Sequence, residues 1–181
     1  MPVSFDYQVP GQIATAAFIN FLADTVTDHD AQLEAATYGH YAGKLITVAA
    51  TKATTASTTE VAVTDYGFSN LDIPAGRMVE FVARLRAQST VAADAVMFRL
   101  RQGSVSGAIV GEERLPLIAA ATPYERVLTF PWRSTGGPIT WVLTAHRITG
   151  TGSVTITTGG PTLPGAFYVR DLAPDTAFTI I

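Results

Sequence analysis

MVEFVARLRAQ, residues Met78 to Gln88, and AVMFRLRQ, residues Ala95 to Gln102, are the two stretches that decide the fold. In both, apolar and polar side chains alternate with a period of two, the period of a β-strand with one buried face. The expected inward-facing side chains are Val79, Phe81, Ala83 and Leu85 in the first stretch and Val96, Phe98 and Leu100 in the second. The expected outward-facing side chains are Glu80, Arg84, Arg86, Arg99 and Arg101. These two strands predict a sheet with a solvated outer face.

Shorter segments of the same kind recur along the chain after Gly39. The expected strands are Lys44–Ala50, Glu60–Tyr66, Met78–Gln88, Ala95–Gln102, Ala108–Val110, Tyr124–Trp132, Ile139–Arg147, Ser153–Thr158 and Phe167–Leu172. Many short strands separated by Gly, Pro, Asn and Asp turns are typical of sandwiches and barrels. We therefore expect a mainly β fold, with an antiparallel jelly-roll-like β-sandwich over residues 40–181. An immunoglobulin-like sandwich is the alternative.

Before Gly39 the spacing of apolar residues is helical instead. The residues that recur in steps of three and four, as at the a and d positions of a coiled coil, are Ile19, Leu22, Val26, His29, Leu33 and Ala36. Thr15 suits the N-cap, and Gly39 suits the position after the last turn. The sequence thus predicts one α-helix within an N-terminal arm of residues 1–39, which serves oligomerisation or attachment.

Two arrangements of this helix remain open. Its stripe can close between chains as a coiled coil, because short helices gain most of their stability from packing against partners. Phe18 and Phe21 widen the apolar stripe, so the helix can also fold against its own sandwich. His29 lies in the stripe, where we interpret it as a polar register-setting residue rather than a metal ligand.

Composition excludes several classes of protein. The net charge is −3 and Lys44 and Lys52 are the only lysines, so the chain lacks the clustered basic face that nucleic acid requires. No apolar run approaches the roughly 20 residues that span a bilayer, and residues 1–12 do not resemble a secretory signal. The chain has no cysteine, which excludes disulfides and thiolate sites. We expect a soluble protein made in the cytoplasm, with no nucleic-acid or membrane partner.

Residues that could support catalysis do not form a recognisable motif. The loop Gly103-Ser104-Val105-Ser106-Gly107 places valine where a nucleophile elbow needs serine. The acidic pairs Glu112/Glu113 and Asp24/Asp28 are interpreted as solvated surface rather than as a glycosidase pair. No phosphate-binding loop, dinucleotide fingerprint or metalloprotease motif occurs. We therefore expect no enzymatic activity, no cofactor and no metal.

Two tryptophans are candidates for recognition of a partner. Trp141 alternates with Ile139 and Leu143, which favours a place in the core. Trp132 follows Pro131 at a strand end, beside Arg133 and a glycine-rich loop. Exposed tryptophan and arginine side chains often anchor partners, and aromatic rings stack on sugars. Trp132 and Arg133 are thus the predicted contact residues for a partner or a host surface glycan.

Two local patterns carry a resemblance to a known group of proteins. They are GQIATAAFIN, residues Gly11 to Asn20, and FYVRDLAP, residues Phe167 to Pro174. The first resembles the opening of the short helix that precedes a sandwich in structural proteins of tailed bacteriophages, especially small tail and appendage proteins of phages that infect actinobacteria. The second is similar to their closing strand, although Ala173 replaces the usual glycine.

The resemblance implies a homotrimer located in the virion, held together by the N-terminal helix as a trimeric coiled coil. The expected function is that of a non-enzymatic virion structural protein, most simply a minor tail or appendage protein with an exposed sandwich. Its expected partners are further copies of itself and other virion proteins. A capsid decoration or head-fibre protein is one alternative, and a carbohydrate- or receptor-binding module is another.

Overall fold

The computed structural model describes residues 40–46, 50–158 and 164–174, and these residues contain strands but no helix. The predicted N-terminal helix lies outside the described residues. So do its proposed oligomerisation residues, Ile19, Leu22, Val26, His29, Leu33 and Ala36. Within the described ranges no helix has the length and hydropathy needed to cross a membrane.

Ten strands make up the described part of the chain. They are β1 (His40–Ile46), β2 (Thr51–Thr55), β3 (Val61–Asp72), β4 (Arg77–Ser89), β5 (Asp94–Gln102), β6 (Ile109–Leu117), β7 (Tyr124–Arg133), β8 (Pro138–Thr149), β9 (Val154–Thr157) and β10 (Gly165–Pro174).

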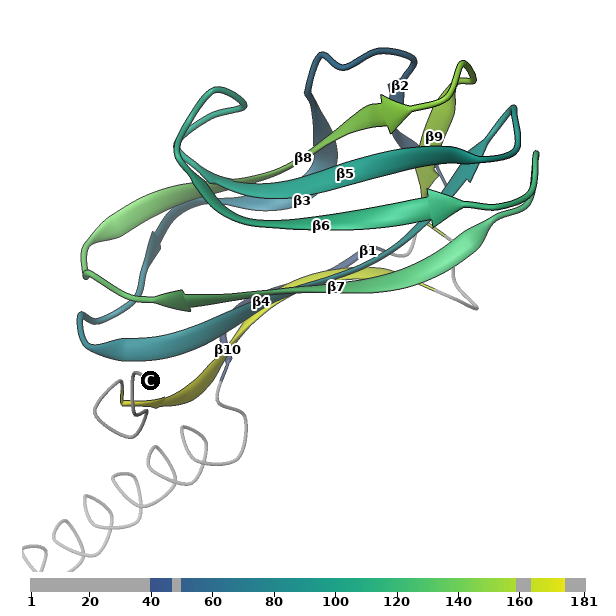
Figure 1. The fold of residues 1–181 in the computed structure, drawn as a ribbon. Helices are drawn as coiled ribbons and strands as arrows, with labels where there is room; N and C mark the ends of the chain where they lie inside the picture. The colour runs from purple at the N-terminus through teal and green to yellow at the C-terminus, as the bar shows by residue number, and fades with distance from the viewer. Residues whose placement is uncertain (1–39, 47–49, 159–163, 175–181) are drawn as a thin grey trace, which may run out of the picture. The chain divides into compact units, whose positions relative to one another are not determined.

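The strands form two antiparallel sheets that face each other (Figure 1). In the first sheet β4 pairs with β7 on one side. On its other side β4 pairs with β10 along residues 77–84 and with β9 along residues 86–89. β1 then pairs with β10, and β2 pairs with β9. The second sheet has the order β3-β8-β5-β6. The prediction of a mainly β, antiparallel sandwich is confirmed.

Side chains in β4 and β5 face the sides that the sequence predicts. The inward-facing residues of both strands are at most 1% exposed, and these are Val79, Phe81, Ala83, Leu85, Val96, Phe98 and Leu100. Burying each large apolar side chain contributes roughly 1.5–3 kcal/mol relative to leaving it in water. Alternation along these two strands therefore supplies much of the sandwich core.

Aromatic side chains fill the centre of the core. Trp141 is 1% exposed, and its ring lies 4.3 Å from that of Phe81 and 4.8 Å, edge-on, from that of Trp132. Phe68 and Phe167 stack at 4.9 Å and bridge the two sheets. The prediction that Trp141 belongs to the core is confirmed.

The sandwich has two distinct ends. At the proximal end β1 begins and β10 finishes, beside the turn between β3 and β4 and the loop between β7 and β8. At the distal end lie the loops β2–β3 (56–60), β4–β5 (90–93), β6–β7 (118–123) and β8–β9 (150–153). β1 therefore begins, and β10 ends, toward the end opposite these four loops.

Several strand limits differ from the predicted ones. β1 begins at His40 and ends at Ile46, whereas the sequence predicted a strand from Lys44 to Ala50. β2 was not predicted, because this edge strand is rich in threonine and buries only Lys52 and Thr55. β3 and β6 continue past their predicted ends, to Asp72 and Leu117. Hydrogen bonding to neighbouring strands extends these segments where local alternation is weak.

Candidate functional site

A polar cluster lies on the outer face of the second sheet. Glu60 precedes β3, and its carboxylate accepts hydrogen bonds from Arg99 and from Arg101, the latter at 2.6 Å from Nε. The hydroxyl of Thr144 donates to the same carboxylate at 2.8 Å. Strand alternation explains this convergence, because Arg99 and Arg101 point outward from β5 and Thr144 lies opposite Arg99 on β8.

Electrostatics fix the charge of this cluster. The hydrogen bond from Arg101, aided by those from Arg99 and Thr144, lowers the pKa of Glu60 to about 2 although burial opposes the shift. The hydrogen bond with Glu60 in turn raises the pKa of Arg99 above its usual value. Glu60 is therefore an anion at neutral pH, and its two arginine neighbours compensate it. Such a carboxylate is a weak base, and its hydrogen bonds hold β3, β5 and β8 together.

His146 borders this cluster on β8. Its Nδ1 lies 3.8 Å from Oε1 of Glu60 and has no hydrogen-bond partner within the described part of the chain. Burial, with the nearby charge of Arg99, lowers the pKa of the imidazole below its usual value. The ring is therefore neutral at pH 7. Among residues 40–46, 50–158 and 164–174, no group of three or more His, Asp or Glu side chains is arranged to hold a metal ion.

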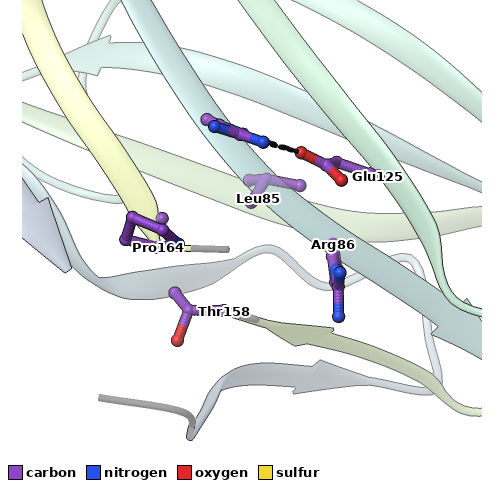
Figure 2. A pocket seen from close by; sticks show the side chains of 7 residues that line it. Leu85, Arg86, Glu125, Thr158 and Pro164 are labelled. Carbon is purple, nitrogen blue, oxygen red and sulfur yellow. Dashed lines mark hydrogen bonds and ion pairs between the residues drawn. The ribbon is translucent and has the colours of Figure 1, made fainter. Parts of the chain in front are cut away.

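A small hollow lies where β9 and β10 diverge from β4 (Figure 2). Leu85, Thr158 and Pro164 line it, and the ion pair between Arg84 and Glu125 crosses its rim. Its volume is about 10 Å³, which corresponds to room for about one water molecule. An organic ligand does not fit there.

At the distal end, a buried carboxylate joins two loops. Asp94 is 1% exposed, and its carboxylate accepts a hydrogen bond from the hydroxyl of Ser89. The amide of Gly152 also donates to it, at 3.1 Å. The backbone amide of Thr90 donates to the carbonyl of Ser153 at 3.1 Å. Because buried polar groups are costly to leave unpaired, these bonds fix the β4–β5 loop against the β8–β9 loop.

The β6–β7 loop is attached to the same structure. The amide of Ala121 donates to the carbonyl of Ser89 at 2.7 Å, and that of Ala119 donates to the hydroxyl of Tyr124 at 2.8 Å. Ala121 and Ala93 have φ angles of 53° and 63°, in the left-handed region that costs a residue with a Cβ roughly 1–2 kcal/mol. Strain of this kind persists where surrounding contacts fix the backbone.

Apart from Glu60, whose carboxylate is paired with Arg99 and Arg101, the distal loops carry no charged side chain. The segments 56–59, 90–93, 118–123 and 150–153 contain no charged residue. Val91 is 40% exposed and Ile118 is 74% exposed. The distal end is therefore a hydrogen-bonded, nearly uncharged surface with two exposed apolar side chains, which is an arrangement suited to contact with another molecule.

The predicted contact residues lie at the other end of the sandwich. Trp132 is half-buried near the end of β7, where its ring packs against Trp141 and lies 6.4 Å from Phe81. Arg133, the last residue of β7, is exposed. The structure does not place either residue at the distal loops. The prediction that they contact a partner stays a prediction.

Sequence reasoning missed the two buried acids, Glu60 and Asp94. Both partner sets are separated in the chain: Glu60 binds residues of β5 and β8, and Asp94 binds Gly152. The only local signal was the pair Arg99 and Arg101 on one face of a strand, which needs a compensating acid when it is partly buried.

Comparisons with known proteins do not assign the chain to a family. No protein-family model matches the chain, and no curated protein matches it in sequence. Similar solved structures include an insecticidal delta-endotoxin of Bacillus thuringiensis, at 14% identity and a TM-score of 0.40. A CBM4 structure matches at 14% identity and a TM-score of 0.39. The VP2 protein of infectious bursal disease virus matches at 13% identity and a TM-score of 0.36.

The matched regions differ in extent. The match to the endotoxin covers 66% of this chain and 19% of the endotoxin. The match to the CBM4 structure covers 75% of this chain and 92% of that structure, and the match to VP2 covers 75% of this chain and 37% of VP2. The chain thus spans only a minor part of the endotoxin and of VP2. Likeness at these identities and TM-scores assigns no function.

Proposed function

We propose that this chain is a non-enzymatic structural protein of a tailed-bacteriophage virion, a homotrimeric minor tail or appendage protein with a surface-exposed sandwich. The observation that carries the proposal is the division between the two ends of the sandwich. β1, the first described strand, begins at the proximal end, and the hydrogen-bonded, nearly uncharged loops lie at the distal end. A protein attached by one end and free to make contacts at the other suits an appendage.

We further infer that the sandwich is a jelly roll. β1 and β2 together fill one position of the first sheet and β10 and β9 fill the next, so that each sheet has four positions. β5 and β6 pair as a hairpin in the second sheet, whereas β3, β4 and β5 alternate between the sheets. Eight positions connected in this way match two Greek keys wound together.

The absence of enzymatic activity is part of the proposal. Its support is the state of the most polar cluster among the described residues, where Glu60 is held as an anion by Arg99 and Arg101. A general acid or base needs a pKa near the working pH, and Glu60 is far from it. Turnover of host cell-wall preparations by the purified chain would contradict this part.

The homotrimer rests on the predicted stripe of the N-terminal helix. Leu22→Asp with Val26→Asp should dissociate the trimer and leave the sandwich folded, because the two changes place charges in the predicted seam. Light scattering measures the mass, and fluorescence of Trp132 and Trp141 reports on the sandwich. A wild-type chain that is monomeric at high concentration contradicts the trimer.

The location in the virion is tested separately, by the copy number per particle. Three or six copies indicate the tail, and a multiple near the number of capsomers indicates a capsid decoration or head fibre. Quantitative mass spectrometry of purified virions supplies the number. Absence of the chain from the particle would contradict a virion protein of either type.

A carbohydrate- or receptor-binding module is the second candidate function. The half-buried position of Trp132 weighs against it, since stacking on a sugar needs an accessible ring face. A glycan array with the wild-type chain and Trp132→Ala tests this candidate. Binding that the substitution abolishes, in a variant that remains folded, would favour it over a purely structural role.

A further inference from the structure

A second hollow lies beside the distal end, between β5 and β6. Its volume is about 270 Å³, close to the lower limit of small-molecule sites. Six of the residues that line it are Ala93, Asp94, Ala95, Arg114, Pro116 and Ile118. Because Ala95 pairs with Pro116, the hollow lies across one face of β5 and β6, and β6 is the edge strand of the second sheet.

Most of the side chains that line this hollow are apolar, although part of its accessible surface is polar. Ala93, Ala95, Pro116 and Ile118 bring only hydrocarbon side chains, and Ile118 is 74% exposed. The carboxylate of Asp94 is directed to its buried partners at Ser89 and Gly152, so it adds no exposed negative charge. An exposed isoleucine beside such walls leaves apolar surface in contact with water, which a ligand of the same character would remove.

Arg114 is the one cationic side chain that lines the hollow. The acidic residues next to it on β6 are already paired: Glu112 with Arg99 and Glu113 with Arg126. Arg114 is exposed and has no acidic partner among the residues that the structure describes. An arginine without a counter-ion at the rim of an apolar hollow is complementary to a carboxylate, which guanidinium binds through paired hydrogen bonds.

We propose that this hollow binds a peptide segment that carries an aliphatic side chain next to a carboxylate. The guanidinium of Arg114 receives the carboxylate, and the aliphatic group lies against the exposed Pro116 and Ile118. Bracing of the distal loops through Asp94 holds Ala93 and Ala95 in place, so the walls exist before the ligand binds. The proposal does not depend on where the protein is located or on its oligomeric state.

The test uses the full-length, isotope-labelled chain and N-acetyl-leucine as the probe, with N-acetyl-leucinamide as the matched ligand that lacks the carboxylate. A ligand of this size should bind with a Kd of about 2 mM. Amide shifts should be confined to 93–97 and 114–119, and the amide probe should bind roughly threefold to tenfold more weakly.

Variants separate the two halves of the site. Arg114→Gln should weaken N-acetyl-leucine by roughly threefold to tenfold and abolish its preference over the amide. Arg170→Gln is the control, because it removes the same charge from an exposed arginine on the other sheet. Ile118→Ser should weaken both probes equally. Equal binding of acid and amide to the wild-type chain, or no shift at tens of millimolar, would overturn the proposal.

Discussion

Replacing Glu60 with glutamine tests whether the outer cluster of the second sheet stabilises the fold. The carboxylate compensates Arg99 and Arg101, whose side chains are 24% and 11% exposed, and is itself 11% exposed. Glutamine keeps the size of the side chain and one acceptor for Thr144. It removes the negative charge, so that two half-buried guanidinium groups share no counter-ion at that position.

The expected loss is about 3 kcal/mol at pH 7. The pKa of Glu60 falls from 4.5 to about 2, and each pKa unit corresponds to about 1.4 kcal/mol of preference for the charged form. Removing one partner of a buried ion pair typically costs about 3–5 kcal/mol. The lower end applies here because Arg99 also binds Glu112.

The pH dependence has a definite sign. A carboxylate whose pKa is lowered by folding stabilises the folded state fully above its unfolded value of 4.5, and this stabilisation is lost as the pH falls toward 2. Glutamine has no such titration. The wild-type chain should therefore lose its advantage over Glu60→Gln progressively between about pH 5 and pH 2.

Urea unfolding monitored by tryptophan fluorescence measures the difference. Both tryptophans, Trp132 and Trp141, lie in the sandwich, so the signal reports on this part of the chain. Glu112→Gln is the control: its side chain is 51% exposed, and an exposed pair of this kind contributes at most about 1 kcal/mol. A loss below about 1 kcal/mol for Glu60→Gln at pH 7, or an equal loss at pH 7 and pH 3, would refute the reasoning.

Three further substitutions test the distal loops and the core. Asp94→Ala should destabilise the sandwich by about 1–3 kcal/mol and speed hydrogen exchange of the Gly152 amide, which loses its acceptor; unchanged exchange would contradict the bracing role. Ala121→Gly should be neutral or should stabilise by up to about 1 kcal/mol, because glycine adopts its φ of 53° without strain, and a clear loss in thermal unfolding would count against that. Gly67→Ala should cost at least about 1–3 kcal/mol, since its Cβ would lie 2.5 Å from the carbonyl oxygen of Trp141; a melting temperature equal to the wild type would show that the backbone can yield.

The strands that could be predicted are those whose burial follows alternation. β4 and β5 each have one apolar, buried face and one polar, partly buried face, so the period of two in the sequence identifies both their type and their inward side. β2 escaped prediction because it is a short edge strand with threonine on both faces. Its burial of Lys52 depends on Asp65, an acid on the following strand 2.7 Å away.

Trp132 shows that a position near a strand end does not by itself expose a side chain. Its position after Pro131 suggested an exposed ring, whereas the register of β7 on β4 sets it opposite the buried Val79 and turns it toward the interior. A change of one residue in register would reverse its direction. The alternation of Leu128, Phe130 and Trp132 within β7 already indicates this inward direction, whereas the pairing of Trp132 with Val79 is set by a strand 53 residues earlier in the chain.

By itself the sequence determined the class of the fold, the inward faces of its main strands and the core position of Trp141, because each follows from local periodicity and hydropathy. Only the tertiary structure decided which strands are neighbours, and with them the polar and apolar groups that meet. Glu60 with two arginines, Asp94 with Gly152, and Arg114 beside Ile118 are each brought together by strand pairing or loop packing. Such groupings depend on long-range contacts, whereas alternation is visible within a single strand.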